Sequence, residues 1–341
     1  MARIKTAVWY VDANSPDPGI LAEAGALIRR GRLVAFPTET VYGLGVNASD
    51  PAAVAALFEA KGRPAEKALT LHLGVPEEAL HYVRDIPPLA AKLIEAFWPG
   101  PLTLVLFGAQ RLPPMVTGGL PTIGLRVPAH PVALGIISAA GVPLVAPSAN
   151  LSGRPTPDAA EQVLADLGGR IDAVVDGGRT PIGVASTVLD VTGPGLRILR
   201  PGAVSAEEIA AVIGVIPEGV PGEEAKRPHW RPEIPLVLVE GDPEAIMERV
   251  QQLYDHYTAE GKRVGILTRE ERIKEYPGIV VACGRGHDAR SVAASLYTAI
   301  RRLEAETDII LAEGVPAQSA GAVCERLRRA ASQVIQAGNG L

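Results

Sequence analysis

Cysteine is scarce in this sequence and long apolar runs are missing, and each shortage excludes a class of protein. The 341 residues include two cysteines, Cys283 and Cys324, neither of which has a CxxC or Cys/His partner. A disulfide framework or a zinc site is therefore not expected, and a reducing cytoplasm suits the chain. No apolar stretch reaches the roughly 20 residues of a membrane helix, and the N-terminus lacks a signal-peptide pattern. We expect a cytoplasmic protein without membrane contact.

Several nucleotide and catalytic motifs are also missing. The sequence has no G-x-x-x-x-G-K-[ST], no HExxH, no GxSxG and no kinase motif set, so a P-loop cannot hold a nucleotide here. The run GRGHDA (284–289) fits G-x-G-x-x-A, with Glu304 and Glu306 about twenty residues further on. It follows a later strand of its domain, however, so a plain strand–helix turn is favoured over a dinucleotide site. The net charge of −5 argues against broad nucleic-acid binding.

The length and the apolar pattern predict two α/β domains. In residues 1–214 short strands often follow one another without a helix between them, which favours a mixed sheet. Residues 215–235 are rich in proline and mixed charges and indicate a linker or lid. In residues 236–341 strands and helices alternate, which predicts right-handed βαβ units and a mainly parallel sheet, with a last helix over 321–338.

Polar side chains collect in the first domain at the ends of its predicted strands. The run AFPTETVYGLG (35–45) packs Thr38, Thr40 and Tyr42 closer together than a hydrophobic core requires. The segment KGRPAEK (61–67) offers Lys61, Arg63 and Lys67, which suit a polyphosphate, although the same segment alone also fits a solvated basic turn.

Two further residues lie inside apolar strands. His72 in LTLHLG is, taken alone, typical of a structural histidine. Arg126 in TIGLRVPAHP requires a partner, which would be either a ligand carboxylate or a structural Asp or Glu.

Hydroxyls, an amide and two arginines complete the clusters. PSANLSGRPTP (147–157) supplies Ser148, Asn150 and Thr156, which suit phosphate or nucleotide oxygens or cap a helix from Asp158. VASTVLD (184–190) and RILRPG (197–202) add Ser186 and Arg200, among others. Ligands of α/β sheets bind at such strand ends. Because the set holds no obvious nucleophile–base pair, it favours catalysis by positioning and electrostatics, as in nucleotidyl transfer.

Seven ordered motifs carry a family resemblance that covers nearly the whole chain. FPTETVYGLG, KGRP, WPGPLTLVL, RVPAHP, APSANLSGRPTP, STVLD and LRPG closely resemble the threonylcarbamoyl-AMP synthase family. The first domain resembles its YrdC-like catalytic module, with a twisted mixed sheet. The second, with ILAEGVP and ERLRRAAS, resembles the smaller Rossmann-like parallel α/β domain of the longer form.

The resemblance implies a nucleotidyltransferase, an L-threonylcarbamoyladenylate synthase. It would form threonylcarbamoyl-AMP and pyrophosphate from L-threonine, bicarbonate or CO2, and ATP. A tRNA threonylcarbamoyl transferase would then use the product to make threonylcarbamoyladenosine at position 37 of tRNAs that read ANN codons. Mg2+ is the implied metal, bound with the ATP phosphates rather than by a protein site.

The resemblance also assigns residues. It implies that L-threonine binds at Thr40, Tyr42, His72, Arg126, Ala146 and Ser186, with Gly43 and Gly45 letting the backbone approach the ligand. ATP-binding positions are Lys61, Arg63, Lys67, Thr122, Ser148, Asn150, Thr156, Arg200 and Arg227. Of these, Lys61, Arg63 and Arg200 would neutralise the triphosphate during catalysis.

The sequence departs from the family pattern twice. Lys67-Ala68 stands where the family has Asn-Pro, and Arg227 and Trp230 stand where its linker has tyrosines.

Two other functions also fit parts of the pattern. One is a non-catalytic RNA-binding module on the same fold, although no RNP or KH signature is present. The other is a carbamoyl-adenylate former that uses carbamoyl phosphate, although the zinc-finger and acylphosphatase domains of such proteins are not visible.

Overall fold

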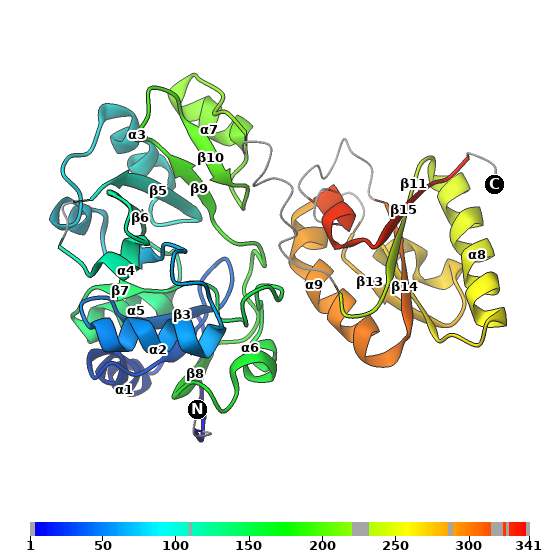
Figure 1. Ribbon diagram of the computed structural model, residues 1–341, viewed down its shortest axis with the longest axis horizontal. Coiled ribbons are helices and arrows are strands. Elements are labelled where there is room, and N and C mark those ends of the chain that lie inside the picture. The colour runs from blue at the N-terminus through cyan, green and yellow to red at the C-terminus, as the bar shows by residue number, and fades with distance from the viewer. Residues whose placement is uncertain are drawn as a thin grey trace. The chain divides into compact units, whose positions relative to one another are not determined.

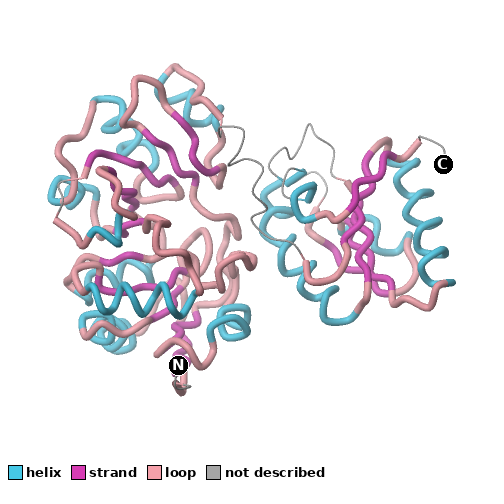
Figure 2. Tube along the Cα trace, viewed as in Figure 1, coloured by secondary structure: helices cyan, strands magenta, loops and turns pink. Residues whose placement is uncertain are grey.

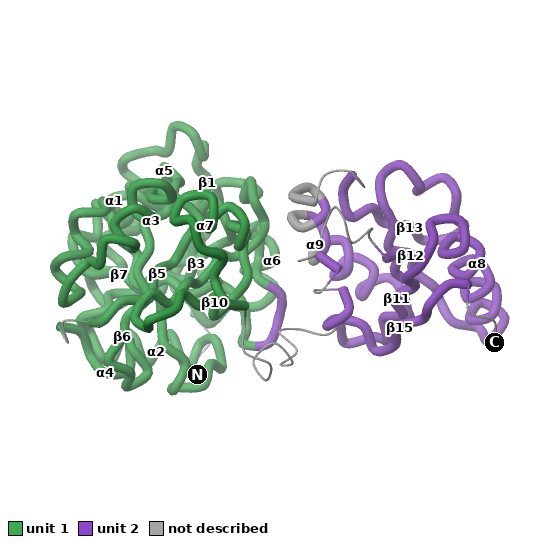
Figure 3. Tube along the Cα trace, turned by 90° about the horizontal axis from the view of Figure 1, so that it is seen from above, with its two compact units in different colours: residues 1–152, 156–225 green, residues 153–155, 226–341 purple. Residues whose placement is uncertain are grey.

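The computed structural model divides the chain into two compact units (Figures 1 and 3). The first comprises residues 1–152 and 156–225, and the second comprises 153–155 and 226–341. The structure describes residues 4–108, 111–219, 232–285, 289–314, 323–324 and 327–338. The division between the units falls after residue 225, inside the predicted linker 215–235. The ends of that linker, at residues 214 and 235, stay predictions.

The first unit is built on a mixed sheet of ten strands (Figure 2). In chain order these are β1 (Ala7–Tyr10), β2 (Val34–Phe36), β3 (Gly43–Asn47), β4 (Thr70–His72), β5 (Leu102–Phe107), β6 (Thr122–Arg126), β7 (Leu144–Val145), β8 (Ala173–Asp176), β9 (Thr187–Asp190) and β10 (Arg197–Arg200). Their order across the sheet is β1-β8-β2-β3-β7-β4-β6-β5-β9-β10. The sheet contains both parallel pairs, such as β4 with β6, and antiparallel pairs, such as β5 with β6. The predicted mixed sheet is confirmed.

The first five α-helices of this unit each begin at a proline. The helices of the unit are α1 (Pro18–Arg29), α2 (Pro51–Lys61), α3 (Pro88–Phe97), α4 (Pro114–Thr117), α5 (Pro131–Ala140), α6 (Ala160–Leu167) and α7 (Ala206–Ile213), with the 3-10 helix η1 (Pro76–His81). Helix α2 starts on Pro51 behind an Asp50 cap and ends at Gly62, whose φ of 58° is in the left-handed region that favours glycine. Helix α7 begins with a capping box of Ser205 and Glu208.

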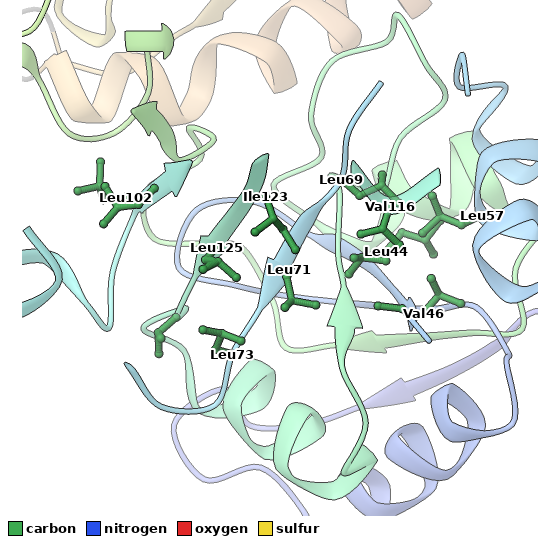
Figure 4. Packing of buried hydrophobic residues seen from close by; sticks show 14 of the residues in the cluster. Leu44, Val46, Leu57, Leu69, Leu71, Leu73, Leu102, Val116, Ile123 and Leu125 are labelled. Carbon is green, nitrogen blue, oxygen red and sulfur yellow. The ribbon is translucent and has the colours of Figure 1, made fainter. Parts of the chain in front are cut away.

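Apolar side chains from both halves of the sheet form one large core beneath these helices. Figure 4 shows Leu44 and Leu71 on the strands facing Leu57 of α2 and Val116 of α4, all fully buried. Truncating such a leucine to alanine typically costs about 2–5 kcal/mol. The core therefore gives the strand ends above it a rigid base.

The second unit is a parallel sheet of five strands. They are β11 (Leu236–Glu240), β12 (Val264–Thr268), β13 (Ile279–Ala282), β14 (Ile309–Glu313) and β15 (Gln333–Gln336), in the order β13-β12-β14-β11-β15. Helices α8 (Pro243–Ala259) and α9 (Ala289–Glu306) lie on opposite sides of the sheet (Figure 1), and the 3-10 helix η2 (Glu270–Glu275) follows β12. The predicted Rossmann-like parallel domain is confirmed. No described helix is long and apolar enough to cross a membrane.

One predicted element is wrong. The helix expected over 321–338 gives way after Ala330 to strand β15, whose residues Gln333–Gln336 pair in parallel with β11 from Val237 to Glu240. Val334 and Ile335 are β-branched and suit a strand, but a run this short has no periodicity that separates it from the end of a helix. The open edge of β11 decides the outcome, because it offers backbone hydrogen bonds along the whole segment.

Candidate active site

A small cavity opens in the first unit where several of its strands end. Eight of the residues predicted for the site line it: Thr40, Tyr42, His72, Arg126, Ala146, Ser148, Ser186 and Arg200. They come from the β2–β3 turn, the ends of β4, β6, β7 and β10, and the residue before β9. The sheet order brings these strands together although up to 160 residues separate them in the sequence. The predicted convergence of polar clusters at strand ends is therefore seen in the fold.

The turn between β2 and β3 is held by its own hydroxyls. Thr38 Oγ1 lies 2.8 Å from Thr40 Oγ1 and donates to the carbonyl of Val41 at 2.7 Å. Thr180 Oγ1 donates to the carbonyl of Thr40 at 3.0 Å, which ties the turn to the segment after β8. Both Thr38 and Thr40 are buried. The close packing of polar residues in this run thus builds a rigid wall of the cavity.

Tyr42 faces the cavity, but its hydroxyl is engaged elsewhere. The hydroxyl donates to the carbonyl of Gly178 at 2.7 Å and lies 3.3 Å from Asp176 Oδ1. Burial, together with the negative charge of Asp176, raises the pKa of Tyr42 well above its usual value. A ligand would therefore meet the backbone or the ring of Tyr42 rather than a free phenol.

The two glycines of this run have different roles. Gly43 lines the cavity, and a Cβ placed on it would lie 3.3 Å from Ala146 Cβ. A Cβ on Gly45 would lie 2.5 Å from Cε1 of Phe36, deep in the core. The expectation that Gly45 lets the backbone approach a ligand is wrong, because the Phe36 ring fills that space.

Arg126 and His72 are directly paired residues on neighbouring strands and are both buried. The Arg126 guanidinium Nη2 lies 2.6 Å from Glu39 Oε1, without the alignment of a hydrogen bond, and Nε donates to the carbonyl of Gly100 at 3.1 Å. Burial and the positive charge of Arg126 lower the pKa of His72 to about 3, so its imidazole is neutral at ordinary pH. The cavity therefore presents one charged guanidinium beside a neutral ring.

Lys61, at the end of α2, reaches the loop after β7. Its Nζ donates to the carbonyl of Ser148 and, at 2.6 Å, to that of Asn150. Burial, and secondarily the nearby Arg63, lower the pKa of Lys61 to about 7, whereas Asp166 acts in the opposite direction. The ammonium thus fixes the loop that carries the predicted nucleotide contacts.

Two further cations complete the basic set. Burial lowers the pKa of Arg63, whose Nη2 donates to the carbonyl of Ala68 while its buried Nε has no hydrogen-bond partner among the described residues. Arg200 donates through Nη2 to the carbonyl and to the Oγ of Ser186, at 2.8 and 3.1 Å. Ser186 Oγ in turn lies 2.8 Å from Thr103 Oγ1. The residues predicted for the two substrates are thus in direct contact.

Among the described residues predicted to bind ATP, Ser148 and Arg200 line the cavity and the others do not. Lys61 contacts the carbonyls of Ser148 and Asn150, and Arg63 lies near Lys61. Thr122 begins β6, at the opposite end of that strand from Arg126. Thr156 is half-buried in the loop before α6, and Lys67 is exposed. Arg227 and Trp230 lie outside the described residues. These assignments stay predictions.

Two residues in contact with this set were not found from the sequence. Glu39 is the structural partner that Arg126 required, and Thr103 supports Ser186. Glu39 stands three residues after the buried strand β2 and between two threonines, which is a detectable signal in itself. Thr103 sits in an apolar strand and gives no such signal.

The electrostatics of the cavity suit anions. Arg126 and Arg200 line the cavity as cations, and Glu39 is the carboxylate in contact with Arg126. Lys61 lies behind the lining residue Ser148, whose carbonyl it contacts, and Arg63 is close enough to Lys61 to lower its pKa. Among the described residues, no three His, Cys, Asp or Glu side chains are grouped so as to hold a metal ion. Such a cavity can bind a small carboxylate and a phosphate chain side by side.

Comparison with known proteins agrees with this geometry. A family model for Sua5, YciO and YrdC proteins, described as telomere recombination, matches residues 26–202, and one for the threonylcarbamoyl-AMP synthase C-terminal domain matches residues 204–332. The threonylcarbamoyl-AMP synthase of Bacillus subtilis is 44% identical, covering 96% of this chain and 98% of its own length. That of Pyrococcus abyssi is 41% identical, covering 90% and 92%.

A solved structure points the same way. P. abyssi Sua5 complexed with L-threonine matches with a TM-score of 0.88 and 39% identity, over 97% of this chain and 99% of that one. Both domains and their order are shared with these proteins. The chain therefore belongs to the threonylcarbamoyl-AMP synthase family.

Proposed function

We propose that this protein is an L-threonylcarbamoyladenylate synthase. It would convert L-threonine, bicarbonate or CO2, and ATP into threonylcarbamoyl-AMP and pyrophosphate. The relatives named above are enzymes of that name, and one of them binds L-threonine. The observation that carries the proposal is that buried Arg126 and neutral His72 line the same cavity as Ser148, Ser186 and Arg200.

Threonine would bind with its carboxylate against Arg126. A guanidinium that is 4% exposed is strongly desolvated, so an anion that reaches it forms a strong charge-assisted hydrogen bond. The hydroxyls of Thr40 and Ser186 would then meet the polar groups of the amino acid. His72 carries no charge at neutral pH and would not repel an ammonium group.

ATP would bind along the basic side of the cavity as its magnesium complex. Mg2+ is usually bound by substrate phosphates together with water, so the nucleotide would bring the ion with it. Lys61, Arg63 and Arg200 would neutralise the triphosphate, and the loop around Ser148 and Asn150 would hold the nucleotide by hydrogen bonds.

The reaction would take place in two steps. The neutral amine of threonine attacks the carbon of CO2 and loses a proton, which gives a carbamate. A carbamate oxygen then attacks the α-phosphorus of ATP, and the bond to the departing pyrophosphate breaks in line. The basic residues stabilise the charge that develops on pyrophosphate, and the enclosed site keeps the carbamate from water.

The product would pass to a separate tRNA threonylcarbamoyl transferase in the cytoplasm. A mixed carbamate–phosphate anhydride is hydrolysed readily, so a reaction that transfers the threonylcarbamoyl group must follow. We place this protein in the formation of threonylcarbamoyladenosine at position 37 of tRNAs that read ANN codons.

Pyrophosphate release tests the proposal. The purified protein is incubated with ATP, Mg2+, bicarbonate and each of the twenty amino acids in turn. We expect release with L-threonine and with few others. A folded protein that releases no pyrophosphate with threonine would contradict the proposal, and RNA binding would then be the function to measure.

A further inference from the structure

We infer that Glu39 is a positioning residue for the amino-acid substrate: its carboxylate holds the Arg126 guanidinium in the orientation that receives the substrate's carboxylate. The inference deepens the proposed function and rests on it. Glu39 is not one of the binding residues predicted from the sequence. It would act through Arg126, because Glu39 is absent from the described residues that line the cavity whereas Arg126 lines it.

The first argument is the geometry of the pair. The Glu39 and Arg126 side chains are 7% and 5% exposed, and Oε1 lies 2.6 Å from Nη2. Gly100 accepts from Nε on the same edge of the guanidinium. The described residues thus contact Nε and Nη2 and make no hydrogen bond or ion pair with Nη1, which we infer to be the nitrogen that meets the ligand.

The second argument is how firmly Glu39 is held. Its backbone carbonyl accepts from the N–H of Ile182 at 3.0 Å. Its neighbours Thr38 and Thr40 are joined by the hydroxyl contact described above, and Thr180 holds the carbonyl of Thr40. The same rigid turn therefore carries the Thr40 wall of the cavity and the carboxylate behind Arg126.

The third argument is that the Glu39–Arg126 pair has fewer aligned hydrogen bonds than a purely structural ion pair. Glu313, an equally buried glutamate in the second unit, accepts from Thr268, Arg272 and Tyr276. Both carboxylate oxygens of Glu39 are buried, yet neither has an aligned hydrogen bond, and Arg126 Nη2 has none either. Buried polar groups left in this state cost stability, so they call for a functional explanation.

His130 is the other ionisable group near Glu39. The charge of Glu39 raises the pKa of His130, but burial has the larger effect and lowers it. His130 Nδ1 accepts from the N–H of Val132 at the start of α5, so the helix fixes this ring. Arg126 is therefore the charged group on which Glu39 acts.

The test measures steady-state constants for Glu39→Gln, Arg126→Gln and the double variant by pyrophosphate release. Glu39→Gln removes the negative charge that faces Arg126, so the guanidinium loses its fixed orientation and its charge-assisted hydrogen bond to the substrate carboxylate weakens. KM for L-threonine should therefore rise about tenfold or more. KM for ATP should change less than about twofold, since the basic side of the cavity is untouched. In the Arg126→Gln background, Glu39→Gln should add nothing, because the group that it positions is gone.

Other results overturn the inference. An unchanged threonine KM in Glu39→Gln would do so, and so would a rise that persists in the Arg126→Gln background or an equal rise in KM for ATP. Glu313→Gln is the matched control, since it removes a buried, arginine-paired carboxylate and should leave the threonine KM unchanged. If Glu39→Gln fails to fold, Glu39→Asp replaces it; this variant keeps the charge, shortens the reach, and should again raise only the threonine KM. A wild-type protein without threonine-dependent release would instead contradict the proposed function itself.

Discussion

Among the described residues, each unit contains one buried glutamate that is paired with an arginine, and the two pairs are built differently. In the second unit Glu313 has three donors, and the Arg272 ion pair measures 2.7 Å. In the first unit Glu39 faces Arg126 at 2.6 Å without an aligned hydrogen bond. The saturated network is what a structural role requires, whereas the unsaturated pair borders a cavity.

The same contrast extends to the surroundings. In the first unit, Arg63 Nε is also buried and has no hydrogen bond to a described residue. In the second unit, Arg269 Nε is buried and lacks a hydrogen bond in the same way. Buried polar groups are nearly always satisfied in folded proteins, so the unsatisfied atoms of Glu39 and of Arg126, which lines the cavity, agree with a site that a ligand completes. The comparison therefore supports the proposal that the substrates bind in the first unit.

Removing Arg126 should have the largest effect. Arg126→Gln is expected to lower kcat/KM for L-threonine about 100-fold, because the substrate carboxylate loses its charged partner. Steady-state pyrophosphate release measures this. Arg197→Gln is the control, since Arg197 lies on the nearby strand β10 and pairs with Asp190 at 3.0 Å while staying 47% exposed. If Arg197→Gln lowered kcat/KM for L-threonine as much as Arg126→Gln, the claim that Arg126 binds the substrate would be contradicted.

Removing Arg63 should affect the ATP side of the cavity. Arg63→Met, which keeps an apolar stem, is expected to slow adenylate formation about 30-fold while threonine binding measured by calorimetry changes little. Lys67→Ala, in the same segment but exposed, should cost much less. Equal losses of adenylate formation and threonine binding would contradict the division of the cavity into two sides.

The pH dependence of ATP use should report Lys61. Its pKa of about 7 means that the ammonium is charged below that pH and neutral above it. Because the phosphates need the charged form, kcat/KM for ATP should fall as pH rises through about 7, approaching tenfold per pH unit at its steepest. The arginine of Lys61→Arg stays charged across this pH range, so kcat/KM for ATP should no longer fall as pH rises through about 7. If the fall persists in this variant, a group other than Lys61 causes it.

The smallest effect on catalysis is expected in the second unit. Glu313→Gln breaks a buried ion pair and should lower the free energy of unfolding by about 3 kcal/mol, measured with denaturant. The constants for threonine and ATP should stay within about twofold of the wild type. A threonine KM shifted as far as in Glu39→Gln would show that the contrast between the two glutamates is without functional meaning.

Much of this arrangement could be predicted from residue types at strand ends. Arg126 in an apolar strand required a carboxylate, and the two partners considered, a ligand and a structural glutamate, are compatible, since Glu39 occupies one edge of the guanidinium. The cap at Gly62 and the capping box at Ser205 follow local rules, so they were predictable without the fold.

The rest depended on contacts between distant segments. The Tyr42 hydroxyl bonds to Gly178, far away in the sequence, and Phe36 fills the space beside Gly45. Strand β15 exists because β11 offers an open edge, which a four-residue segment with two apolar residues cannot reveal. Pairing order and side-chain packing, unlike caps and turns, are properties of the whole chain.

Mass spectrometry of the reaction product tests the central claim most directly. The protein is incubated with ATP, Mg2+, L-threonine and isotopically labelled bicarbonate, and the nucleotide products are analysed at once. The account predicts an adenylate that carries both threonine and the labelled carbon, and predicts its loss in Arg126→Gln. An active protein that yields only AMP or ADP, or an adenylate without the label, would contradict the account.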